Sequence, residues 1–238
     1  MRLRLSIGRR GFFIAAFAFS LVALLPMRLA LDWLGLDSNG LAAREASGSV
    51  WLGALKEAQL GPVPLGDVGA RLNALPLLIG RARVSLARTG EDGSIAGAAV
   101  ASRHAFGFDD VTGQARLGAM LAPLPIAALD FQRVSVGFAS GQCQRAEGMV
   151  RATIAGDLGG IALPSGLSGE ARCAEGALLL PLASQSGMEL LNLRIHADGR
   201  YRAELMVRPG DQAARERLIG AGFAPAGAGV ARLLEGSF

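Results

Sequence analysis

Short runs in which apolar and polar residues alternate recur along most of the chain, and they predict many β-strands. The clearest pair covers 191–197 and 201–207, on either side of Asp198-Gly199, a dipeptide typical of a tight turn. We therefore predict a β-hairpin over 191–207. A short helix with Asp211 as its N-cap should follow, and 230–234 should form a final edge strand.

Earlier segments show the same alternation. In one strand Val68, Ala70 and Leu72 should face inward, and similar strands are predicted over 81–86, 133–138 and 150–154. Two apolar stretches that contain proline, 73–79 and 120–129, are poor candidates for long helices, and we predict them to be short plugs against the sheet. The fold class is mainly β: a curved, mostly antiparallel sheet with short helical plugs and a short C-terminal helix.

The N-terminal region differs from the rest. Residues 11–25 carry no charge, and 12–31 supply the length of about 20 residues that a membrane-spanning helix needs. A cleaved signal peptide would look similar, but Met27, Arg28 and Leu29 stand where small residues would be needed for cleavage, so we favour an uncleaved anchor. We divide the chain into a cytoplasmic basic segment (1–11), a transmembrane helix (12–31), a linker (32–45) and a β-rich domain (46–238).

Charge gives the orientation of this anchor. The chain has a formal net charge of +4, and four arginines precede the apolar run: Arg2, Arg4, Arg9 and Arg10. Without these four arginines the chain has 20 basic and 20 acidic residues. The rest of the protein is therefore neutral, and a nucleic-acid partner is not indicated. Positive flanks stay in the cytoplasm. We therefore expect a single-pass protein of the inner membrane, in contact with its lipid, with the C-terminal domain in the periplasm.

The two cysteines, Cys143 and Cys173, both lie in the exported part. An oxidising compartment favours a disulfide between them, and each leads through Ala-Glu-Gly into an apolar segment, so they are similarly placed at strand starts. The alternative is two unrelated buried thiols. We predict the disulfide.

Residues suited to catalysis are few. The only histidines are His104, in a predicted loop, and His196, on the outward side of the hairpin. The adjacent carboxylates Glu91-Asp92 and Asp109-Asp110 are also predicted to lie in solvated loops. The 33 glycines fit turns and bulges rather than a nucleotide-binding loop. The sequence predicts no enzyme, no cofactor, no metal site and no small-molecule substrate.

The exported part is apolar for its size, as in the run 177–182. One interpretation is a sheet with one buried face and a thin polar cover. The other is an open, curved sheet whose apolar inner surface accepts a lipid or a strand of another protein.

The order of several features resembles the type II secretion system protein N family. The anchor with its arginines is followed by Gly48, Ser49, Val50, Trp51 and Gly53, then by a leucine-rich segment ending at Gly80-Arg81. Cys143, Cys173 and the Asp198-Gly199 hairpin continue the likeness, which covers nearly the whole chain. Trp51 alone could also be a core aromatic on a strand.

The resemblance implies an accessory inner-membrane subunit of the general secretory machinery, which exports folded proteins from the periplasm through contacts with other secretion subunits. It also implies a fold related to AsmA-like proteins, and from these comes the alternative function, a periplasmic lipid-binding or lipid-transfer module in envelope maintenance. A third possibility, the clamp-like protein C of the same machine, would need a PDZ-like helix and strand pattern that this sequence does not show.

Overall fold

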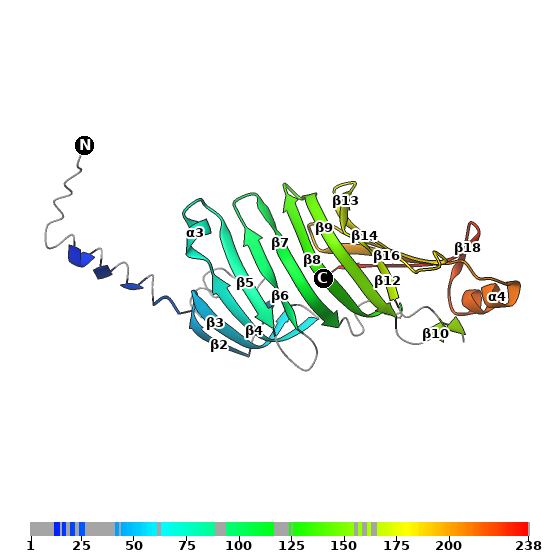
Figure 1. The fold of residues 1–238 in the computed structure, drawn as a ribbon, viewed down its shortest axis with the longest axis horizontal. Coiled ribbons are helices and arrows are strands. Elements are labelled where there is room, and N and C mark those ends of the chain that lie inside the picture. The colour runs from blue at the N-terminus through cyan, green and yellow to red at the C-terminus, as the bar shows by residue number, and fades with distance from the viewer. Residues whose placement is uncertain are drawn as a thin grey trace.

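The computed structural model describes residues 12–14, 16–17, 20–21, 24–26, 41–42, 44–60, 63–88, 94–116, 124, 126–154, 157–158, 161–162 and 166–237. Almost all of the described chain forms one large open sheet (Figure 1). The mainly β class predicted from sequence is confirmed.

Sixteen described strands form this sheet, and every pairing is antiparallel. In chain order they are β1 (Leu41–Ala42), β2 (Glu45–Ser49), β3 (Leu52–Leu60), β4 (Val63–Leu72), β5 (Ala82–Arg88), β6 (Ile95–Ala101), β7 (Ala105–Arg116), β8 (Ile126–Ala139), β9 (Gln142–Ile154), β12 (Gly166–Glu170), β13 (Arg172–Ala174), β14 (Ala177–Ala183), β15 (Glu189–Ile195), β16 (Arg200–Val207), β17 (Ala224–Ala226) and β18 (Gly229–Ser237). Strands β10 (Asp157–Leu158) and β11 (Ile161–Ala162) form a separate pair. The helices are α3 (Ala74–Leu77) and α4 (Gln212–Gly220).

Neighbours in sequence are mostly neighbours in the sheet, in the order β1-β3-β4-β5-β6-β7-β8-β9-β12-β14-β15-β16-β18-β17, with β2 beside β3 and β13 beside β14. Such an order follows from short hairpin connections. The predicted hairpin is confirmed: Leu191 lies opposite Leu205 and Leu193 opposite Ala203. Asp211 caps α4, since its Oδ1 accepts from the amide of Ala214 at 2.6 Å.

The sheet buries its two halves unequally. One large hydrophobic cluster joins β8, β9 and β12 to β14, β15, β16 and β18, and Leu167, Leu182 and Leu191 are fully buried in it. We call the face that carries this cluster the inner face. Towards the N-terminus the described residues of the inner face form a small second cluster of Leu55, Ala58, Val68 and Ala70. Figure 1 shows β14, β16 and β18 crossing the direction of β5–β8. The C-terminal half therefore closes into a core, whereas the N-terminal half is open.

The N-terminal predictions lie largely outside the described residues. Arg2, Arg4, Arg9 and Arg10 are not described, and of the predicted transmembrane helix only 12–14, 16–17 and 20–21 are described as helical. Among the residues that the structure describes, no helix has the length and apolarity to cross a membrane. Within the predicted linker, Leu41–Ala42 pairs with β3, and β2 begins at Glu45.

The prediction of two helical plugs is wrong in part. The segment 73–79 does contain a helical turn, α3, but it plugs nothing, since Leu75 is 79% exposed and Leu78 is 83% exposed. In the second segment, Ile126–Leu129 is the start of strand β8, and most of 120–125 lies outside the described residues. Proline excludes a long helix at both places, but the sequence alone does not say what the remaining apolar residues contact.

Candidate functional site

The disulfide that we predicted is present, between Cys143 on β9 and Cys173 on β13, with Cα atoms 5.5 Å apart. Cys143 is buried in the large cluster, and its amide donates to the carbonyl of Gly176 at 2.7 Å. Cys173 differs from our prediction in its placement, because it lies in the short strand β13, before the turn that leads into β14. The bond fastens the β13–β14 hairpin to β9.

The segment from Gly48 to Gly53 forms the β2–β3 hairpin. Gly48 lies opposite Gly53, and Val50 and Trp51 make the turn. Gly48 has φ +84°, and a Cβ atom there would lie 2.3 Å from the carbonyl oxygen of Leu52, so only glycine fits. Trp51 is half-buried. The spacing of the two glycines in this motif fits a tight turn.

This turn joins three parts of the chain. The amide of Val50 donates to the carbonyl of Leu25 in the N-terminal segment at 3.1 Å, and the carbonyl of Val50 accepts from Leu72 at the end of β4, also at 3.1 Å. Pro26 bridges to Ser49. The hairpin therefore lies at the corner of the sheet where the apolar N-terminal segment enters.

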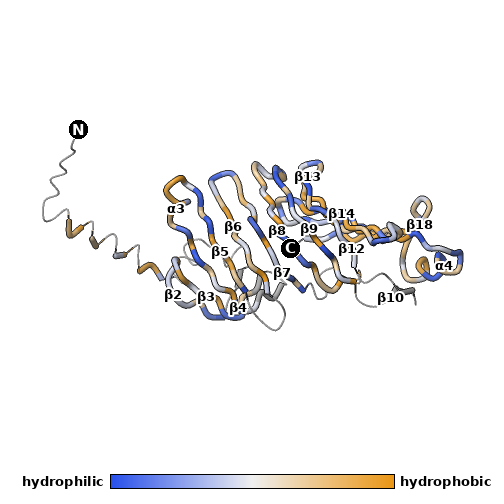
Figure 2. The backbone as a smooth tube through the Cα atoms, viewed as in Figure 1, coloured by the Kyte–Doolittle hydropathy of each residue, from blue (hydrophilic) through white to orange (hydrophobic). Residues whose placement is uncertain are grey.

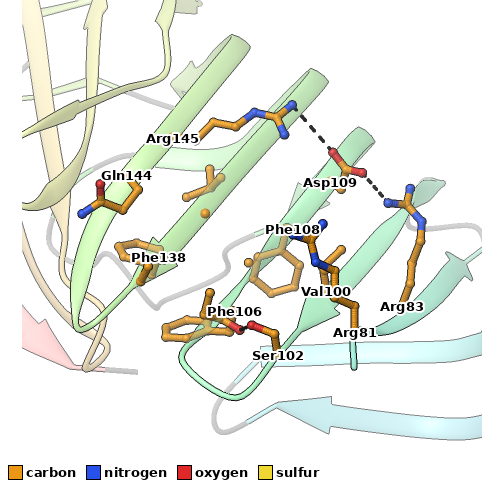
Figure 3. Close-up of a pocket in the computed structure, with 15 residues that line it drawn as sticks. Arg81, Arg83, Val100, Ser102, Phe106, Phe108, Asp109, Phe138, Gln144 and Arg145 are labelled. Carbon is orange, nitrogen blue, oxygen red and sulfur yellow. Dashed lines mark hydrogen bonds and ion pairs between the residues drawn. The ribbon is translucent and has the colours of Figure 1, made fainter. Parts of the chain in front are cut away.

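Three strands share a cluster of charges on the outer face. A row of cross-strand partners runs from β5 to β9: Arg83, Val100, Gly107, Gly137 and Arg145. The side chains of Arg83 and Arg145 therefore lie on the same face. Asp109 pairs with Arg83, and its other oxygen lies 3.9 Å from Arg145 (Figure 3). Ser135 on β8 donates to Asp109 at 3.2 Å, and Arg145 also pairs with Glu147.

The cluster borders a shallow groove of about 340 Å³ over β5–β9. The guanidinium of Arg83 holds the pKa of Asp109 below its ordinary value, with smaller contributions in the same direction from Ser135 and Arg145, while partial burial opposes them. A carboxylate that is kept ionised in this way is not poised as a general base near neutral pH. The arrangement links β5, β7, β8 and β9 through charged and polar side chains.

The predicted placement of Asp109 is wrong. We predicted that Asp109-Asp110 lies in a loop, but both residues belong to β7, at a bulge where Asp110 has φ +53°. A carboxylate pair in the middle of a strand looks like a loop in sequence. Only the cross-strand register reveals its partners.

The inner face is apolar beyond the closed core. Val84, Ala99, Phe108 and Val136 are successive partners across β5, β6, β7 and β8. Phe108 is 50% exposed, whereas Val136 belongs to the large cluster. Of the two interpretations of the sheet, the C-terminal half agrees with a buried face and the N-terminal half with an open apolar surface.

The end of the sheet also exposes an edge. Strand β18 pairs with β16 over 230–237, but β17 covers only 229–231, so no described strand pairs with the other side of 232–237. Pro225 lies in β17, where a proline blocks further pairing. In the described part of the chain, no three His, Cys, Asp or Glu side chains are grouped to hold a metal ion.

Residues 39–233 match the model of the family described as type II secretion system (T2SS), protein N. This match spans the β2–β3 hairpin, the charge cluster, the disulfide and most of β18. The chain belongs to this family.

Membership of the T2SS protein N family gives the chain a role in type II secretion, as a component associated with the cell envelope that interacts with other secretion subunits. The family is a secretion accessory component. No curated protein and no solved structure matches the chain. The relation of this protein N sheet to AsmA-like proteins therefore stays a prediction.

Proposed function

We propose that the protein is an accessory bitopic subunit of the type II secretion machinery in the inner membrane. Residues 12–31 cross the membrane, the four N-terminal arginines stay in the cytoplasm, and the sheet lies in the periplasm. The uncharged run 11–25 and its arginine flank support this topology. The disulfide supports an oxidising compartment.

The open edge of β18 is the observation that carries the proposed mode of action. The backbone amides and carbonyls on one side of an edge strand are free to pair with an extended segment of another protein. Leu233 is 48% exposed along this edge, and Leu234 packs against the large cluster, so the edge is backed by a stable core. We propose that another secretion subunit adds a strand to 232–237.

The edge is limited in a way that suits one defined partner. Arg232 donates to the carbonyl of Ala221 at 2.9 Å, at the end of the edge that β17 covers. Together with Pro225 in β17, this contact leaves an open stretch of about six residues, close to the length of an ordinary strand. A short edge of this kind favours pairing with one segment over continued aggregation.

Photocrosslinking in living cells tests this mode of contact. A benzophenone amino acid placed at Leu233 should give a discrete adduct with an inner-membrane subunit of the secretion machine, identified by mass spectrometry. Arg151 is the matched control position, because it is exposed but lies on β9 with strands on both sides. An adduct that persists in cells without the other secretion subunits, or equal adducts at both positions, would refute the edge contact.

A further inference from the structure

The turn that contains α3 presents apolar side chains to solvent. Leu75, Leu78 and Ile79 are 79%, 83% and 72% exposed, and Leu77 is 39% exposed. Backbone hydrogen bonds close this turn. The amide of Leu78 donates to the carbonyl of Leu75 at 3.2 Å, and the amide of Arg81 donates to the carbonyl of Pro76 at 3.0 Å. We call residues 75–79 the α3 tip. Four large apolar side chains on one short turn are costly to leave in water.

Other turns at the same end of the sheet have a different character. They are Ser102-Arg103-His104 between β6 and β7, Ser140-Gly141 between β8 and β9, Glu175-Gly176 between β13 and β14, and 196–199 between β15 and β16. Each of these turns contains polar or charged residues. The β2–β3 turn beside α3 is also apolar, with half-buried Val50 and Trp51 and with Leu52 63% exposed. Among the described turns at this end, the apolar surface is therefore confined to the α3 tip and the neighbouring β2–β3 turn.

The α3 tip lies at the corner where the N-terminal segment enters. The amide of Leu72, shortly before the tip, donates to the carbonyl of Val50, and the amide of Val50 donates to the carbonyl of Leu25. Leu24 is 76% exposed, and Phe17 and Leu21 before it are also exposed. In Figure 1 α3 lies at the end of the sheet from which the N-terminal segment extends, opposite α4, and Figure 2 shows the tip as apolar.

We propose that the α3 tip inserts into the periplasmic leaflet of the inner membrane beside the anchor, as a second membrane contact. The inference rests on the proposed function, because it needs residues 12–31 to cross that membrane. An apolar tip next to a membrane-spanning segment has lipid within reach, and lipid is a solvent for exposed Leu and Ile side chains. The exposed Arg71 and Arg81 flank the tip, where guanidinium groups can bind lipid phosphates.

Two contacts would fix the sheet relative to the membrane, whereas a single helix would leave it free to rotate. The N-terminal half would then lie against the bilayer. The closed core and α4, at the opposite end of the sheet, would extend away from it (Figure 1). The α3 tip thereby orients the edge of β18 towards partners.

Fluorescence in brominated lipid tests the contact. The full chain, with Trp33→Phe and Trp51→Phe, is reconstituted into vesicles of phosphatidylethanolamine and phosphatidylglycerol that have brominated acyl chains. Leu78→Trp should then give blue-shifted emission that is quenched several-fold more than the emission of His104→Trp, a matched probe at an exposed polar turn of the same sheet end. Mass spectrometry of the intact disulfide checks the fold of both variants.

Vesicle flotation separates this inference from the proposed function. If the chain floats with the vesicles but the emission of Leu78→Trp is quenched no more than that of His104→Trp, the anchor stands and the α3 contact is refuted. If the chain does not float, both the anchor and the α3 contact are refuted.

Discussion

The ring of Phe106 on β7 stacks on the ring of Phe138 on β8, with centroids 5.3 Å apart and 20° between their planes. Phe138 is 7% exposed and belongs to the large cluster, whereas Phe106 is 47% exposed. This pair therefore marks the place where the closed core gives way to the open half of the inner face.

The two rings should contribute very differently to stability. Phe138→Ala should lower the free energy of unfolding by about 3 to 5 kcal/mol, because it leaves a cavity in the core. Phe106→Ala should cost about 1 kcal/mol, since it removes mainly the stacking contact. Urea denaturation of both variants measures the difference, and equal losses would contradict the boundary at this pair.

Removal of the disulfide should destabilise the domain. Cys143→Ser with Cys173→Ser should lower the free energy of unfolding by about 3 to 4 kcal/mol, because the bond closes a loop of about 30 residues in the unfolded chain. A reductant should have the same effect on the wild type and none on the double variant. Mass spectrometry of non-reduced peptides that showed free thiols at both positions would contradict the pairing.

The hairpin motif near the N-terminus should depend on Gly48. Gly48→Ala should cost about 2 kcal/mol, because a side chain at this positive φ is strained and its Cβ would clash with Leu52. Gly210→Ala is the matched control, since a Cβ there meets no atom within 4 Å. Thermal unfolding compares the two variants, and a Gly48→Ala protein as stable as the control would show that this turn tolerates other residues.

The charge cluster should make the free energy of unfolding depend on pH. The pKa of Asp109 is lower in the folded protein than its ordinary value of 3.8, so its contribution is present above that value and is lost as the pH falls through the folded pKa. Asp109→Asn should cost about 1 kcal/mol near neutral pH and progressively less in acid. Asp110→Asn, at the exposed neighbour, is the control. A cost of Asp109→Asn that did not change with pH would contradict this linkage.

Local features of the fold could be predicted from the sequence. The alternation in 191–207 gave the hairpin and its inward face, and Asp211 gave the start of α4, because turn residues and caps act within a few positions. The apolar run 177–182 lies within strand β14.

Features that depend on distant strands could not be predicted. The bulge at Asp110 and the pairing of Asp109 with Arg83 depend on the register of β5 to β8, which no local pattern specifies. The exposure of Leu78 was missed for the same reason, because an apolar turn looks alike in sequence whether it contacts a core, a membrane or water. The half-open inner face likewise depends on how the whole sheet bends.

We propose that this protein supports type II secretion through contacts with other subunits. Deletion of the gene tests this role, with secreted and periplasmic enzyme levels and the permeability and lipids of the envelope measured in the same cells. Exported enzymes should be trapped in the periplasm behind an intact envelope, and the full chain should restore secretion. Normal secretion with a leaky envelope or altered lipids would contradict this role and favour a lipid-handling module.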